Sequence, residues 1–145
     1  AIEDPLGEDD ADAMAKFTVA AGNKIEIVAD DFICTTQAKI ETAQSIGACN
    51  TALIKPNQAG TLTESKAALD AARLAGWESL VSARSGETED VTIVHLAVGW
   101  GVKQLKVGSF TRSERMAKWN EGLRVAEALG QNDGTLAPRS SFPWG

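Results

Sequence analysis

Five short apolar runs recur along the chain at nearly even intervals, and each is followed at once by polar or charged residues. The positions after the runs lie 23 to 28 residues apart: Glu3, Asp30, Lys55, Ala83 with Arg84, and Lys106. A strand, a loop, a helix and a second loop occupy about this length in a (β/α)8 barrel, where functional groups follow the strands. The spacing predicts an α/β fold, a partial TIM-type (β/α) barrel of about five consecutive βα units. Polar residues also follow strands by chance, because loops are polar.

Arg84 and Ser85 follow the fourth run and stand just before a helix-like segment, residues 90–100. An Arg fork beside a hydroxyl and free backbone N–H groups is a favourable place to hold a phosphate or a carboxylate. A capped loop that binds nothing is the alternative, and the residues alone leave both open.

Helical periodicity predicts helices over residues 9–20, 36–46, 62–75 and 90–100, and a fifth helix that ends at Gly130. Two Thr-x-x-Glu strings, one from Thr61 and one from Thr111, have the pattern of a capping box at a helix start. The last helix carries an apolar stripe that predicts a core-facing side: Met116, Trp119, Leu123, Ala126 and Leu129.

Several long strings of this sequence resemble, in the same order, the later part of the barrel domain of enolases. They are residues 2–5, 29–31, 53–61, 85–90 and 111–115. The resemblance runs from residue 2 to about residue 130. It implies the C-terminal part of an enolase barrel and the chemistry of that family, the Mg2+-dependent dehydration of 2-phosphoglycerate to phosphoenolpyruvate.

The resemblance also implies a role for three of the residues that follow the apolar runs. Glu3 and Asp30 match metal ligands of the family, and Lys55 matches its general base. Carboxylates are the ligands that Mg2+ prefers. Taken alone, the acids would be ordinary solvated residues and Lys55 a surface lysine.

Three further residues match substrate-binding positions of the family. Arg84 and Ser85 would bind the phosphate of the substrate, with Arg84 acting through a bidentate fork. Lys106 would hold the carboxylate. Together with the metal ligands and the base, they would surround a small phosphorylated acid.

The sequence departs from the enolase pattern at a few positions beside these residues. Ala83 stands where enolases carry a His, Pro56 where they usually have Val, and Val107-Gly108 where they typically have Thr-Gly. Two alternatives follow: an enzyme like carboxyphosphonoenolpyruvate synthase that acts on a phosphonate analogue, or a non-catalytic enolase-like binding protein.

The length of the chain is too short for a closed barrel. A complete (β/α)8 barrel needs about 250 residues, whereas this chain has 145. We therefore expect a fragment, with residues 1–130 as a partial enolase C-terminal barrel domain and residues 131–145 as a loose tail. Trp144, near the end of that tail, would be docked or exposed. A complete short protein that pairs with another chain is the alternative.

The rest of the enzyme is expected to supply what this chain lacks. The resemblance implies that a missing N-terminal part carries the third metal carboxylate and the general acid, so the isolated chain should be inactive. It also implies a homodimer when the protein is complete.

Composition limits the partners. The net charge is −6 and the isoelectric point is near 4.8, which argues against nucleic acid and anionic membranes but not against a small anion. No apolar run approaches the ~20 residues that span a bilayer. Cys34 and Cys49 have no metal-like spacing, and two free thiols suit the reducing cytoplasm.

Overall fold

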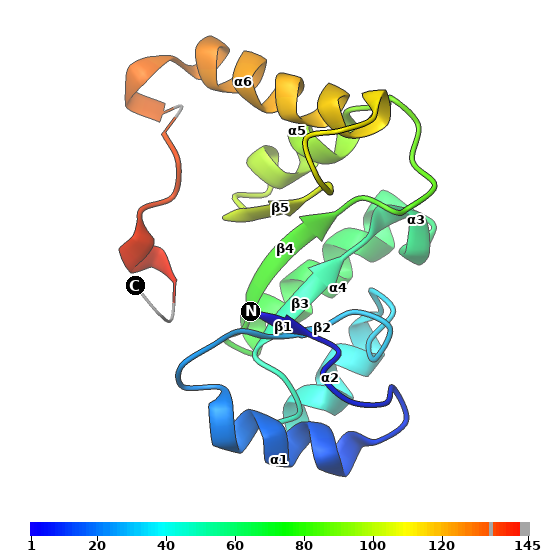
Figure 1. Ribbon diagram of the computed structural model, residues 1–145. Helices are drawn as coiled ribbons and strands as arrows, with labels where there is room; N and C mark the ends of the chain where they lie inside the picture. The colour runs from blue at the N-terminus through cyan, green and yellow to red at the C-terminus, as the bar shows by residue number, and fades with distance from the viewer. Residues whose placement is uncertain (134, 143–145) are drawn as a thin grey trace. The chain divides into compact units, whose positions relative to one another are not determined.

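The computed structural model describes residues 1–133 and 135–142. The chain divides into two compact units, Ala1–Leu80 with Arg139–Gly145 and Val81–Pro138. Five strands alternate with helices, and their order is β1-β2-β3-β4-β5 (Figure 1). This alternation confirms the predicted α/β class and the five βα units.

The first unit contains a parallel sheet. Its strands are β1 (Ile2–Glu3), β2 (Ile27–Ala29), β3 (Thr51–Ile54) and the start of β4 (Glu78–Ser82). Glu3 is paired with Val28, and Val28 with Thr51, in parallel register. All residues of β2 and β3 are buried, as is usual for parallel strands covered on both faces.

Helices connect these strands. The helices described in the first unit are α1 (Ala11–Ala21), α2 (Gln37–Ser45), α3 (Pro56–Ala59), α4 (Leu62–Leu74) and the short 3-10 helix η1 (Arg139–Ser141). The Thr61 hydroxyl accepts from the N–H of Glu64 at 3.1 Å and donates to its carboxylate at 2.8 Å. The first predicted capping string therefore does cap a helix, α4.

The second unit contains the end of β4, α5 (Thr92–Gly99), β5 (Gln104–Lys106) and α6 (Ser113–Asp133). The N–H of Ala83 donates to the carbonyl of Lys106 at 2.9 Å, which ties the end of β4 to β5. Val81, Ile93, Ala97 and Val107 form the buried core of this unit.

The second predicted capping box is wrong. The helix α6 begins at Ser113, and Arg112 before it has a left-handed φ of +68°. An N-cap residue directly precedes the first helical residue. Arg112 takes that place, so Thr111 lies one residue too early to cap the helix. The Thr111 hydroxyl instead lies 2.9 Å from that of Ser109.

The predicted core-facing stripe of α6 is wrong in its later part. Trp119 packs against the core of the second unit, whereas Leu123 and Leu129 are exposed. The eight residues of α5 span about 12 Å, and the 21 residues of α6 would span about 30 Å. Because α5 is much shorter, it covers only part of the stripe. Regular helix is interrupted at Gly130, as predicted, where φ is +77°.

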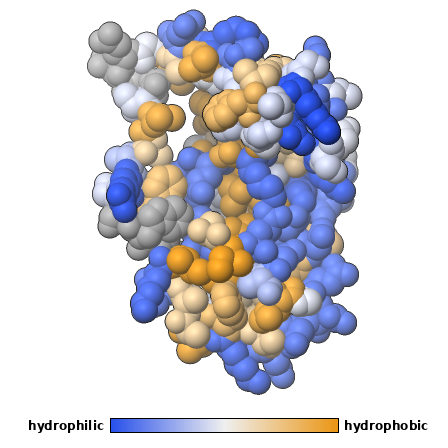
Figure 2. Space-filling model, in the orientation of Figure 1, coloured by the Kyte–Doolittle hydropathy of each residue, from blue (hydrophilic) through white to orange (hydrophobic). Residues whose placement is uncertain are grey.

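The surface mixes polar and apolar side chains, and orange hydrophobic areas interrupt the hydrophilic face drawn in Figure 2. Within residues 1–133 and 135–142, no helix has the length and apolar character needed to cross a membrane. The boundary between a barrel part, 1–130, and a tail, 131–145, stays a prediction. Trp144 lies outside the described residues.

Candidate functional site

Asp30 is a buried acid directly after β2. Its side chain is 8% exposed, and its Oδ2 forms an ion pair with Nζ of Lys55. Its other oxygen, Oδ1, is buried and has no hydrogen-bond partner among the described residues. A buried carboxylate oxygen without a donor is costly, so this atom calls for a cation or another donor.

Lys55 lies at the end of β3, next to Asp30. Its backbone is extended, with φ −115° and ψ 98°, which is the conformation that a following proline favours. Its side chain is only 12% exposed. The interpretation of Lys55 as a surface lysine is therefore wrong, because its ammonium is drawn inward by Asp30.

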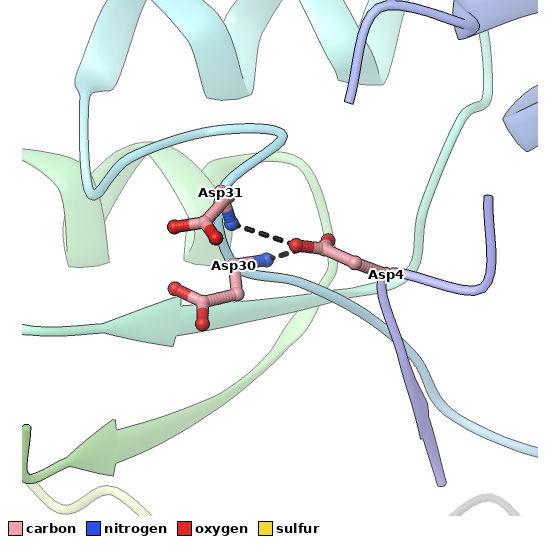
Figure 3. Close-up of side chains that lie close together, drawn as sticks. All are labelled: Asp4, Asp30 and Asp31. Atoms are coloured by element: carbon pink, nitrogen blue, oxygen red, sulfur yellow. Dashed lines mark hydrogen bonds between the residues drawn. The ribbon is translucent and has the colours of Figure 1, made fainter. Parts of the chain in front are cut away.

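Two further acids, Asp4 and Asp31, lie close to Asp30. The Asp4 carboxylate accepts from the N–H of Asp30 at 3.0 Å and from that of Asp31 at 2.8 Å (Figure 3). Ligand atoms of Asp4, Asp30 and Asp31 all lie within 4.8 Å of one another. Sequence reasoning missed Asp4 as a site residue, although it stands beside Glu3 in the first matching string. The parallel pairing of β1 and β2 brings it to the end of β2.

Glu3 is the last residue of β1 and is exposed. It is paired with Val28 of β2, so its side chain leaves the sheet on the same face as that of Val28. Alternation places Asp30, two residues after Val28, on this face as well. Glu3 is not a member of the cluster of Asp4, Asp30 and Asp31. Its role as a metal ligand stays a prediction.

The predicted substrate-binding residues belong to the second unit. Arg84 and Ser85 are exposed on the loop after β4, and Lys106 is exposed at the end of β5. The N–H of Arg84 donates to Oε1 of Glu87 at 2.9 Å, which closes the loop on itself. Ala83, half-buried, packs against the apolar core of this unit and offers no polar side chain.

The side chain of Lys118, on α6, contacts the same loop. This lysine is 1% exposed; its Nζ donates to the carbonyl of Thr88 at 2.7 Å and lies 3.3 Å from Oε2 of Glu87. Sequence reasoning missed Lys118, because a lysine on an amphipathic helix is normally a solvated residue. Its chain of contacts reaches the N–H of Arg84 through Glu87.

The six predicted site residues thus fall into two sets. Asp30 and Lys55 are in direct contact in the first unit, with Glu3 on the neighbouring strand. Arg84 and Ser85 lie in the second unit, where the backbone of Lys106 bonds to the residue just before Arg84. The gathering of both sets around one substrate stays a prediction.

Two comparisons with known proteins show what this chain is similar to. The family model for the enolase C-terminal TIM barrel domain matches residues 1–140. An enolase of Mycobacteroides abscessus is 47% identical over 129 residues, which cover 89% of this chain and 30% of that protein. The chain thus spans less than a third of the length of this curated relative, and the match confirms the predicted partial TIM-type barrel.

Proposed function

The chain belongs to the enolase family, as part of the C-terminal barrel domain, and on this premise we propose that the whole protein is an Mg2+-dependent hydro-lyase. Its substrate would be 2-phosphoglycerate and its product phosphoenolpyruvate. The single observation that carries the proposal is the buried contact between Asp30 and Lys55 at the ends of two adjacent strands. A buried ion pair adds little to stability, so its presence at strand ends favours a chemical role.

Asp30 fits an Mg2+ ion. Its Oδ1 is buried without a hydrogen-bond partner among the described residues, and hard cations take oxygen ligands. Asp30 and Glu3 would hold the ion, with a third carboxylate from outside this chain. When bound, Mg2+ would act as a Lewis acid that offsets the negative charge developing on the substrate carboxylate.

Lys55, in its neutral form, would take the proton from the carbon next to that carboxylate. This proton is weakly acidic, so the base must be held close to it in a fixed direction. Asp30 orients Nζ of Lys55, and the extended backbone before Pro56 limits where the side chain can begin. The general acid that assists departure of the hydroxyl would come from outside this chain.

Arg84, Ser85 and Lys106 would bind the ends of the substrate. The guanidinium of Arg84 and the hydroxyl of Ser85 suit a phosphate, and the ammonium of Lys106 suits a carboxylate. The bonds from Glu87 and Lys118 to the loop support this proposal, because they define the backbone from which Arg84 projects.

Ala83 favours a second candidate. It replaces the family His with a side chain that has no donor and that packs half-buried against apolar neighbours. A phosphonate analogue of the substrate, handled as in carboxyphosphonoenolpyruvate synthases, would then suit the altered pocket. A binding protein without turnover is the third outcome to be tested.

The test uses the full-length protein with Mg2+ and 2-phosphoglycerate. We expect phosphoenolpyruvate formation that stops when the metal is chelated and that Lys55→Met abolishes. Lys66→Met is the matched control, because Lys66 forms an exposed ion pair with Asp70 on α4. Circular dichroism checks that both variants are folded.

Two results would favour the second or the third candidate over the first. Turnover of the phosphonate analogue alone supports the second candidate, and Ala83→His should then shift the preference toward 2-phosphoglycerate. Binding without turnover of either compound supports the third. Activity that survives Lys55→Met contradicts the assignment of Lys55 as the base.

A further inference from the structure

The loop after β2 contains two residues in a rare backbone conformation. Cys34 has a φ of +48° and Thr35 a φ of +49°. Left-handed backbone is uncommon outside glycine and is a true outlier for a β-branched residue such as Thr35. Such strain persists only where the surroundings impose it, and it concentrates at functional sites.

The Thr35 hydroxyl is buried and both donates and accepts a hydrogen bond. It accepts a hydrogen bond from the N–H of Lys55 at 2.9 Å. It lies 3.1 Å from Oε1 of Gln58 and 3.3 Å from the carbonyl of Leu53. Because a hydroxyl has one hydrogen and two lone pairs, Thr35 accepts from Lys55 while it donates to one of these two oxygens.

This bond replaces a missing strand partner. The strand β2 ends at Ala29, which is paired with Ala52, whereas β3 continues to Ile54. The N–H of Lys55 therefore lies beyond the last residue of β2. The Thr35 hydroxyl takes the place that a strand carbonyl would hold, and an unpaired buried N–H would be costly.

Lys55 is thus held at both ends of its side chain. Thr35 fixes the backbone from which the side chain starts, and Asp30 holds the ammonium. Gln58 connects Thr35 with the acidic cluster, since its Nε2 also lies 3.4 Å from Oδ1 of Asp31. The strained loop therefore links the acidic cluster to the end of β3.

We propose that Thr35 is a positioning residue for Lys55. The Thr35 hydroxyl holds the backbone N–H of that lysine and so aims the lysine side chain at the substrate. This inference rests on the proposed function, in which Lys55 removes a proton. A displacement of a reacting group by as little as about 1 Å can cost about 100-fold in rate. The left-handed backbone is what brings the hydroxyl of a loop residue to the end of the neighbouring strand.

The test compares Thr35→Val with Thr35→Ser in the full-length enzyme. Val keeps the shape of Thr but loses the hydroxyl, whereas Ser keeps the hydroxyl. We expect Thr35→Val to lower kcat by about 10- to 100-fold with KM little changed, and Thr35→Ser to stay close to the parent. Thr36→Val is the matched control, because it removes a neighbouring exposed hydroxyl that donates to the carbonyl of Cys34, at 3.0 Å, and not to Lys55 or its neighbours.

An isotope measurement separates positioning from loss of folded protein. With substrate deuterated at the carbon that loses its proton, the isotope effect on kcat should rise in Thr35→Val, because proton removal becomes slower than the other steps. A smaller amount of folded enzyme would lower the rate but leave the isotope effect unchanged. Equal rates and isotope effects in the Val and Ser variants would overturn the inference.

A second variant covers the case in which Thr35→Val does not fold. Thr35→Ala also removes the hydroxyl, and it removes the β-branch, which is the part of the side chain that left-handed backbone tolerates least. We expect a several-fold fall in kcat and a raised isotope effect, and parental values for both would count against Thr35. An inactive parent enzyme overturns the proposed function and this inference together, whereas an active parent with unaffected variants overturns the inference alone.

Discussion

At the scale of single residues, the two cysteines differ in their surroundings. Both are free thiols, with Cys49 buried and Cys34 partly exposed. Burial, and to a smaller extent the negative charge of Asp4, raise the pKa of the Cys49 thiol to about 12 from its ordinary value of 9.0. Because only the thiolate reacts readily, Cys49 should be inert while the chain is folded.

Alkylation should therefore distinguish the two thiols. We expect iodoacetamide at mildly alkaline pH to modify Cys34 in the folded protein and to modify Cys49 only after denaturation, as counted by mass spectrometry. A Cys49→Ala variant should show a single label in denaturant. Labelling of Cys49 in the folded protein at the rate of Cys34 would contradict its burial.

The raised pKa of Cys49 also predicts how stability depends on pH. The unfolded chain releases this proton near pH 9 and the folded chain near pH 12, so the folded state binds the proton more tightly. The resulting stabilisation is complete below about pH 9 and is lost as the pH rises toward about 12. Denaturant titrations should show a smaller loss over this range in Cys49→Ala, and equal losses in both proteins would refute the prediction.

At the scale of elements, the buried contact of Lys118 ties α6 to the loop between β4 and α5. Its ammonium lies between the carbonyls of Thr88 and Glu114 and the carboxylate of Glu87. Burial of a charge is tolerated only when it is paired and hydrogen-bonded. The helix and the loop should therefore lose their order together when this contact is removed.

Lys118→Met should destabilise the protein by about 3–5 kcal/mol, because it leaves Glu87 without its cation. The double variant Lys118→Met with Glu87→Gln should lose less than the sum of the two single changes. Lys66→Met, which breaks the exposed pair with Asp70, should cost less than about 1 kcal/mol. Denaturant unfolding measures all four, and strict additivity of the Lys118 and Glu87 changes would exclude the coupling.

The start of α4 offers a second prediction for an element. Thr61→Ala removes the acceptor of the Glu64 N–H and should cost about 1 kcal/mol in free energy of unfolding. The exposed helical residue Thr63 provides the control, because Thr63→Ala removes the same hydroxyl away from the cap. Equal effects of the two substitutions would show that the cap contributes nothing.

Prediction from the sequence succeeded for the positions of residues that directly follow their own strand. Asp30 and Lys55 follow buried runs, so their strand-end positions could be inferred from spacing. Asp4 could not be inferred in this way, since its bonds to the end of β2 depend on the register between β1 and β2. The burial of Lys118 depends on a loop about 30 residues earlier, and no local pattern reports such a contact.

At the scale of the whole molecule, the chain exposes an edge strand and several apolar side chains. The strand β1 stands at one end of the strand order, and its Ile2 is exposed. Exposed apolar side chains also occur on helices, among them Val19 and Leu74. Unpaired strand edges and apolar surface favour association.

The isolated 145-residue chain should therefore associate or aggregate, as measured by light scattering. Ile2→Lys places a charge on the edge strand and should reduce association. Val19→Lys adds the same charge to α1, away from that edge, and should reduce it less. A soluble monomer that unfolds cooperatively would contradict this expectation, as would equal effects of the two substitutions on the mass of the assemblies.

The carboxylate of Asp4 has both oxygens engaged by the backbone amides of Asp30 and Asp31. Its two hydrogen bonds therefore fix the peptide that carries Asp30. The entropy of ordering that peptide is lost during folding, so a ligand that binds at Asp30 would not have to order it. Binding at Asp30 should then require hardly any rearrangement of the main chain.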